Sequence, residues 1–269
     1  MKQGWLFLLS IAPIFIWPYI DPFDGPFDSR LFGAYRFLVA TVLIALITAA
    51  FYGKQWVQVL GLNMSRKHIF FSALSFALSL PCFYWLIRHA LSEGGSYYVP
   101  VEPAYFPDYY GIYPKVSMFV QRLTQPLNEE IVFRALLLGL LARLFSHRVF
   151  LAILAAVVFS CTHFVLYYFG VMATPLDITT LATLFFFSLA ANALFLTVGH
   201  IGFGFAIHVA WNWWRFPGEI WSGNTVVNEA VSFNLIEGSW PVLLTVALVG
   251  LICFAGLEVQ ERRRSFQKR

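Results

Sequence analysis

The sequence predicts an all-α, polytopic membrane protein with about eight transmembrane helices around a polar intramembrane cavity. Of its 269 residues, 59% are hydrophobic and only 12% are charged, and the mean hydropathy is +0.70. In soluble domains, roughly a quarter of all residues are charged. The 29 Phe, 12 Tyr and 9 Trp residues suit contact with lipid and with the membrane interface. The net charge of +4 is too small to indicate a nucleic-acid partner, so membrane lipids are the expected surroundings.

Apolar runs near the roughly 17–25 residues of a membrane span recur along the chain. They cover 5–20, 37–52, 69–87, 129–145, 150–169, 179–198, 201–216 and 240–257. Several are short, which favours tilt or partial burial in protein. The first run follows Lys2 as a signal peptide would, but no small-residue cleavage site follows it, and we interpret it as a membrane helix that is retained.

We expect one integral-membrane domain over residues 1–269, because no internal repeat is evident. Segment 88–125 is rich in Tyr and Pro and predicts an irregular stretch that leads into an interfacial helix. With the N-terminus inside, the inner loops receive most Lys and Arg, which is typical of a multi-pass protein of the cell membrane. The outer side receives the acids Glu93, Glu102, Asp108, Asp177, Glu219, Glu229 and Glu237.

The three cysteines, Cys82, Cys161 and Cys253, lie far apart in apolar runs and predict buried thiols rather than disulfides or a zinc cluster. Ser188 and Asn192, one turn apart in run 179–198, either extend a polar cavity or form hydrogen bonds between helices.

Charged side chains occur together in the run NEEIVFRALLLGLLARLF, residues 128–145. We expect its helix to begin near Pro126, since proline suits a first turn. Glu130 and Arg134 are four residues apart and form a favourable pair. Glu129 points about 100° away, which leaves it without a local partner. The alternative is that both acids only interact with the positive end of the helix dipole.

Other helices place polar groups at a similar depth. His163 lies in run 150–169, and His208 and Asn212 share one face of run 201–216. At ~1.5 Å per residue, Glu129 lies roughly 5 Å below its outer helix end, Asn212 roughly 6 Å, and the two histidines roughly 10–12 Å. A single cavity shared by three helices explains this coincidence.

A carboxylate beside an imidazole can deprotonate water, and a second imidazole with a carboxamide can stabilise an oxyanion. This set favours hydrolysis of an acyl bond, most simply a peptide, without a cofactor. The alternative is a catalytic zinc held by Glu129, His163 and His208, although the sequence contains no HExxH spacing.

The residues resemble the CAAX prenyl protease type II group, or CPBP (Abi) intramembrane proteases, which include the Ras-converting enzyme. The EExxxR motif corresponds to Glu129, Glu130 and Arg134, and the FxxxH motif to Phe159 and His163. The third motif, His followed four residues later by Asn or Asp, corresponds to His208 and Asn212. The resemblance covers about residues 125–216, the expected catalytic core.

The resemblance implies that Glu129 activates water with His163 as its partner, and that His208 and Asn212 form the oxyanion pocket. Glu130, Arg134 and Phe159 would be supporting residues. Prenyl proteases act on cytosolic C-termini, whereas the charge pattern places this cavity nearer the outer face. Either the topology is inverted or the substrate is not a CAAX protein, and the expected partner is a membrane-associated protein or peptide, lipidated or not.

Two other functional classes remain open at this stage. One is a non-catalytic membrane immunity or scaffold protein that keeps the motifs for stability. The other is a proton-coupled transporter in which Glu129 and the histidines relay protons. The absence of sequence repeats argues against the transporter.

Overall fold

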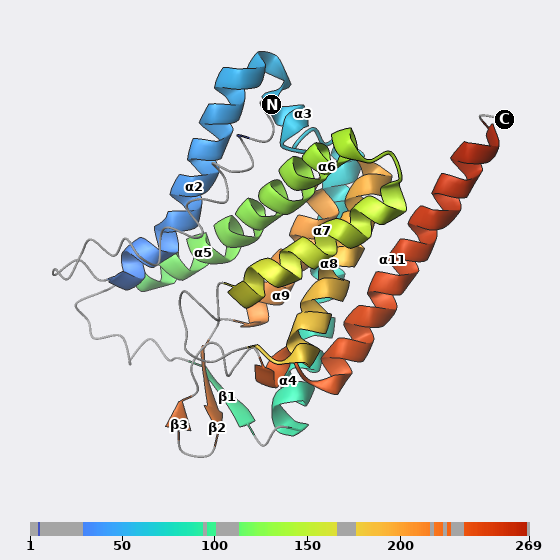
Figure 1. The fold of residues 1–269 in the computed structure, drawn as a ribbon. Coiled ribbons are helices and arrows are strands. Elements are labelled where there is room, and N and C mark those ends of the chain that lie inside the picture. The colour runs from blue at the N-terminus through green and yellow to red at the C-terminus, as the bar shows by residue number, and fades with distance from the viewer. Residues whose placement is uncertain are drawn as a thin grey trace.

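The computed structural model describes Trp5 and residues 29–93, 96–100, 113–165, 176–215, 218–222, 225–226 and 234–267. Within these ranges the chain forms a bundle of long helices (Figure 1). The helices are α2 (Ser29–Tyr52), α3 (Trp56–Val59), α4 (Arg66–Glu93), α5 (Tyr113–Glu129), α6 (Leu138–Leu144), α7 (Arg148–Val165), α8 (Ile178–Val198), α9 (Gly202–Arg215) and α11 (Trp240–Gln267). A 3₁₀ turn, Gly53–Gln55, precedes α3, and a π-helical segment, Glu130–Leu137, joins α5 to α6.

The predicted fold class, an all-α polytopic membrane protein, is confirmed for the body of the molecule. Seven of the eight predicted apolar runs coincide with these helices, while run 5–20 lies outside the described ranges apart from Trp5. In the described part, five helices are long and apolar enough to cross a membrane: Phe37–Val59, Arg66–Ser92, Arg148–Val165, Ile178–Val198 and Trp240–Arg264.

The outer surface of the bundle is apolar, as contact with lipid requires. Leu46 on α2, Leu78 on α4 and Leu248 on α11 are each more than 60% exposed. A water-soluble protein rarely exposes so many large apolar side chains on neighbouring helices. Cys82 and Cys161 lie on the surface and Cys253 is half-buried, so the prediction of three buried thiols was wrong, because apolar runs here face lipid as well as protein.

A small antiparallel sheet at one end of the bundle was not predicted. Strand β1 (Ser96–Pro100) pairs with β2 (Gly218–Ser222), and β2 pairs with β3 (Thr225–Val226). Strand β1 falls within segment 88–125, which we expected to be irregular, and α4 continues into the same segment as far as Glu93. The sheet connects the chain after α4 with the chain after α9 (Figure 1).

The helix that carries the EExxxR motif begins much earlier than predicted. It starts at Tyr113, and Pro126 lies inside it rather than in its first turn. A proline removes one backbone hydrogen bond from a helix interior, but membrane proteins tolerate this where neighbouring elements cover the helix. Pro81 also lies inside a helix, α4, but at an exposed position.

Helices α7 and α8 pack closely through small side chains. Ala152 and Ala156 on α7, and Ala193 on α8, are at most 1% exposed. Asn192 donates from Nδ2 to the carbonyl of Ala152 at 3.0 Å and lies 3.4 Å from the Ser188 hydroxyl. Of the two roles considered for Ser188 and Asn192, Asn192 therefore forms the interhelical hydrogen bond.

The basic chain segments gather at the end of the bundle opposite the sheet. Figure 1 shows α3, the α6–α7 connection and the C-terminal end of α11 at that end. Arg148, at the start of α7, donates to Gln260 of α11 at 3.3 Å and lies 4.0 Å from Glu261. This arrangement agrees with the positive-inside pattern of the sequence.

A tight turn leads from α8 into α9. Gly199 ends α8 with φ of 82°, a left-handed conformation that favours glycine. The next residue, His200, is buried, and its Nδ1 accepts a hydrogen bond from the Gly202 amide at 3.1 Å. Its ring packs against that of His68 of α4 in a tilted arrangement, with centroids 4.3 Å apart and an interplanar angle of 33°.

Protonation of His200 is expected to destabilise the protein. Burial lowers the pKa of His200 below its usual 6.5, and the neighbouring His68 lowers this pKa further. The stabilising contribution of the neutral ring is therefore present above pH ~6.5 and is lost as the pH falls through the lowered pKa. We expect the melting temperature to fall between pH 7.5 and pH 5, and to fall less in His200→Asn, whose side chain still accepts the Gly202 hydrogen bond.

His147→Asn is the matched control, since the exposed His147 accepts a similar hydrogen bond from the Phe150 amide at 3.3 Å. An identical loss of stability in the native chain and in His200→Asn would contradict the role given to His200.

Candidate active site

A cavity of about 450 Å³ lies inside the bundle. Its wall includes four of the residues selected from the sequence, Glu129, His163, His208 and Asn212, from α5, α7 and α9. Helices α4, α8 and α11 supply most of the remaining wall, which is largely apolar. The structure therefore brings together polar groups from three motifs that are distant in the sequence.

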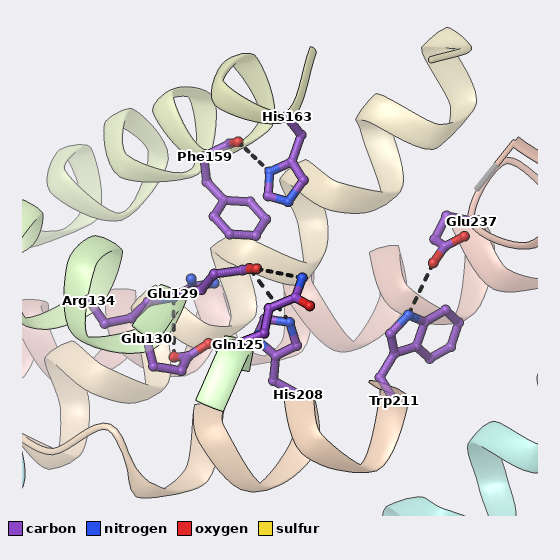
Figure 2. A network of polar contacts seen from close by, with 9 residues as sticks. All are labelled: Gln125, Glu129, Glu130, Arg134, Phe159, His163, His208, Trp211 and Glu237. Atoms are coloured by element: carbon purple, nitrogen blue, oxygen red, sulfur yellow. Dashed lines mark hydrogen bonds and ion pairs between the residues drawn. The ribbon is translucent and has the colours of Figure 1, made fainter. Parts of the chain in front are cut away.

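A chain of polar contacts crosses this site (Figure 2). Gln125 donates from Nε2 to Oε1 of Glu129 at 3.2 Å, and Oε2 of Glu129 lies 3.7 Å from Nε2 of His208. The opposite ring nitrogen of His208, Nδ1, lies 3.2 Å from Oε1 of Glu130. Oε2 of Glu130 is 3.4 Å from Nε of Arg134.

Two expectations about Glu129 were wrong. It does have a local partner, Gln125, which lies one helical turn earlier in α5. Its depth was also misjudged, because the helix begins at Tyr113 and Glu129 lies roughly 24 Å along it at ~1.5 Å per residue. The carboxylate nevertheless reaches the cavity that contains the two histidines.

The predicted pair of Glu130 and Arg134 forms, and both side chains are fully buried. The guanidinium carbon of Arg134 also lies 4.7 Å from the centre of the Phe159 ring, a cation–π contact. The same ring is 4.4 Å from that of His163, centroid to centroid. Phe159 thus connects the arginine of the first motif with the histidine of the second.

The backbone of this segment is unusual. Residues Glu130–Leu137 are π-helical, and such segments inside α-helices often occur at functional sites. Helix α9 approaches this segment closely at Gly204, where an added Cβ would lie 2.5 Å from Oε2 of Glu130. Glycine at this position therefore lets the helix that carries His208 and Asn212 pack against Glu130.

The two histidines have different hydrogen-bond environments. Nδ1 of His163 lies 3.0 Å from the backbone carbonyl of Phe159. A carbonyl only accepts, so Nδ1 carries the hydrogen, and in the neutral ring Nε2 keeps its lone pair. His208 instead lies between two carboxylates, with Nδ1 3.2 Å from Oε1 of Glu130 and Nε2 3.7 Å from Oε2 of Glu129.

A metal-binding arrangement is not found among the described residues. No group of three or more His, Cys, Asp or Glu side chains there has the geometry to hold a metal ion. Glu129, His163 and His208, the set considered for zinc, share the cavity without forming such a group.

Sequence reasoning missed several residues of the cavity, and three of them take part in its polar contacts. Gln125 carries a detectable signal, because it precedes Glu129 by four residues and shares its face. Trp211 was passed over as one of many aromatic residues. Glu237 was assigned to an outer loop, but it is 2% exposed and lines the cavity.

The fold and the site define a polytopic membrane protein with a hydrolase-like polar cavity inside its helical bundle. Residues 112–214 match the family described as Rce1-like: Type II CAAX prenyl endopeptidase Rce1-like. This similarity over residues 112–214 confirms the resemblance given by the three motifs, and the family as described is one of CAAX prenyl endopeptidases. No curated protein and no solved structure matches the chain.

Substitution of Gly204 tests the close approach of α9 to Glu130. In Gly204→Ala the new methyl group displaces Glu130 from Arg134 and His208, and we expect a loss of about 1–3 kcal/mol in the free energy of unfolding. Thermal unfolding in detergent measures this loss. Gly256→Ala in α11 is the control, since no atom lies within 4 Å of its added Cβ, and alanine there should stabilise the helix by about 0.5–1 kcal/mol. Equal stability changes in the two variants would contradict this packing.

Proposed function

We propose that this protein is an intramembrane endopeptidase that hydrolyses a peptide bond of a membrane-associated protein or peptide with a water molecule activated by Glu129. The observation that carries the proposal is the cavity itself, in which an acid, two imidazoles and a carboxamide share one wall within an apolar bundle. The family match supports the peptidase class and covers every one of these residues.

Glu129 is the general base in this proposal. Gln125 holds Oε1 of its carboxylate at 3.2 Å, which leaves Oε2 toward the cavity and His208. His163 assists, because its Nδ1 is occupied by the Phe159 carbonyl and its Nε2 lone pair is available to accept a proton. The water oxygen attacks the peptide carbonyl carbon as its proton moves to this pair.

His208 and Asn212 stabilise the oxyanion that forms. His208 contacts acceptor carboxylates on both ring nitrogens, which favours a donating ring. Asn212 is buried, lines the cavity and follows His208 by one helical turn. When the tetrahedral intermediate collapses, the C–N bond breaks, the proton moves from the base to the leaving amine, and an acid and an amine are released.

Glu130, Arg134 and Phe159 hold this machinery in place. Glu130 fixes Nδ1 of His208, Arg134 compensates the buried charge of Glu130, and Phe159 covers Arg134 and contacts His163. Each acts through another residue of the site.

The decisive experiment compares the rate of cleavage by the native chain with that by Glu129→Gln. The amide cannot accept the proton of water, so we expect cleavage to fall by at least about 10²–10⁴-fold while the melting temperature stays close to that of the native chain. Two measurements test this: hydrolysis of a prenylated peptide ending in a CAAX sequence in reconstituted vesicles, and mass spectrometry of membrane peptides from cells carrying either form. Undiminished cleavage by Glu129→Gln would exclude hydrolysis by this route.

The same proposal takes the reaction to be metal-free, with zinc held by Glu129, His163 and His208 as the alternative. We expect the rate of cleavage to remain unchanged after prolonged treatment with a strong chelator of divalent cations. Loss of activity that added zinc restores would instead favour the zinc-dependent alternative.

A further inference from the structure

Glu237 lies in the turn before α11, and this turn is anchored to α8. Thr183 donates its hydroxyl hydrogen to the Glu237 backbone carbonyl at 2.6 Å. The Asn234 side-chain oxygen accepts from the Asp177 amide at 2.9 Å and from the Thr180 hydroxyl at 3.0 Å. These bonds fix the backbone from which the Glu237 side chain projects.

The Glu237 side chain points to α9 rather than to solvent. It is 2% exposed, lines the cavity, and accepts a hydrogen bond from Nε1 of Trp211 at 3.2 Å (Figure 2). Burial of a carboxylate costs free energy, and one hydrogen bond from an indole N–H offsets only part of that cost. We therefore interpret the contact as one that fixes the position of the Trp211 ring.

Trp211 is also held from the side of α4. Its ring packs edge-to-face on Phe83 with centroids 5.1 Å apart and an interplanar angle of 88°. Phe83 lines the same cavity. The indole is therefore fixed between a hydrogen bond at its N–H and an aromatic contact, which leaves it little freedom to turn.

Trp211 lies in α9 close to the residues that are proposed to bind the oxyanion, so the position of its indole can affect substrate binding. It follows His208 by three residues and directly precedes Asn212, the two residues placed at the oxyanion. At ~1.5 Å per residue, its backbone lies only about 5 Å along the helix axis from that of His208. Trp211 also lines the cavity, so a substrate whose scissile carbonyl faces these residues brings a neighbouring side chain toward the indole.

We propose that Glu237 is a specificity-determining residue that acts through Trp211: it holds the indole as the wall that limits the size of the apolar substrate side chain next to the cleaved bond. This inference rests on the proposed function. The substrate class it names is a peptide with a small apolar residue, such as Ala or Val, at that position.

The test uses variants of the full chain in vesicles. Glu237→Met removes the acceptor at similar length, Glu237→Gln retains an acceptor oxygen, and Trp211→Phe removes the N–H and part of the ring. Matched controls are Glu258→Met, at a half-buried position of α11 that pairs with Arg262, and Trp240→Phe, at an exposed position of the same helix. Melting temperatures show which variants are folded, and Trp211→Phe carries the test if Glu237→Met does not fold.

The probes are prenylated CAAX peptides with Ala, Val, Leu or Phe directly after the cysteine, together with an unprenylated random-sequence library whose cleavage sites are read by mass spectrometry. We expect Glu237→Met and Trp211→Phe each to raise kcat/KM for Leu and Phe relative to Ala by about tenfold, as expected when a pocket wall moves by the size of a methylene or more. Glu237→Gln should keep the native ratio. The double variant Glu237→Met/Trp211→Phe should match Trp211→Phe, because the Glu237 carboxylate acts on selectivity only through the indole that it holds.

An active Glu237→Met with native selectivity would overturn the inference, as would selectivity changes that add in the double variant. Selectivity lost equally in Glu237→Gln and Glu237→Met would also overturn it, since the acceptor would then not be the cause. A native chain that cleaves neither probe would refute the proposed function itself, and the inference with it.

Discussion

The candidate site depends on one fully buried carboxylate, that of Glu130, which Arg134 and His208 share. An ionised acid within a membrane bundle costs several kcal/mol unless it is paired, and removal of one partner from a buried ion pair costs about 3–5 kcal/mol. Because Arg134 lies in the same helix and His208 in α9, this carboxylate connects the first and third motifs. The stability of the bundle and the geometry of the site therefore have a common origin.

Close packing of α9 on the π-helical segment makes this sharing possible. The segment is fully buried from Glu130 to Leu137, and Gly204 leaves just the space that the Glu130 oxygen occupies. The face of His208 that does not meet Glu130 is thereby turned to Glu129 and the cavity. The supporting acid thus sets the direction in which the proposed catalytic groups point.

The membrane helices and the motif residues were predictable because ionisable groups are conspicuous in apolar runs. Glu130 and Arg134 pair as their spacing indicated, because residues four apart still lie on the same face in the local π-helix. The start of α5 was not predictable in the same way. Residues 113–125 are amphipathic and mixed in polarity, and Pro126 satisfies the sequence rule for a first turn while lying in a helix interior.

Glu237 shows a different limit of sequence reasoning. Counting charges along the chain assigns an acid between two membrane spans to a loop, and loops are usually exposed. Whether the loop turns inward depends on contacts with distant residues, here the hydroxyl of Thr183 and the indole of Trp211. Such contacts are formed between residues far apart in the sequence, and no local sequence pattern predicts them.

The two histidines show why identical residue types take different roles in one cavity. His163 lies one turn after Phe159 in α7, and the backbone carbonyl of that residue directs the proton to Nδ1 and leaves Nε2 as an acceptor. His208 has acidic oxygens near both ring nitrogens, so a ring N–H there is directed at an acceptor. A motif specifies the imidazole, but the groups around each ring decide whether it accepts a proton or donates one, and the proposed division between base partner and oxyanion partner rests on that difference.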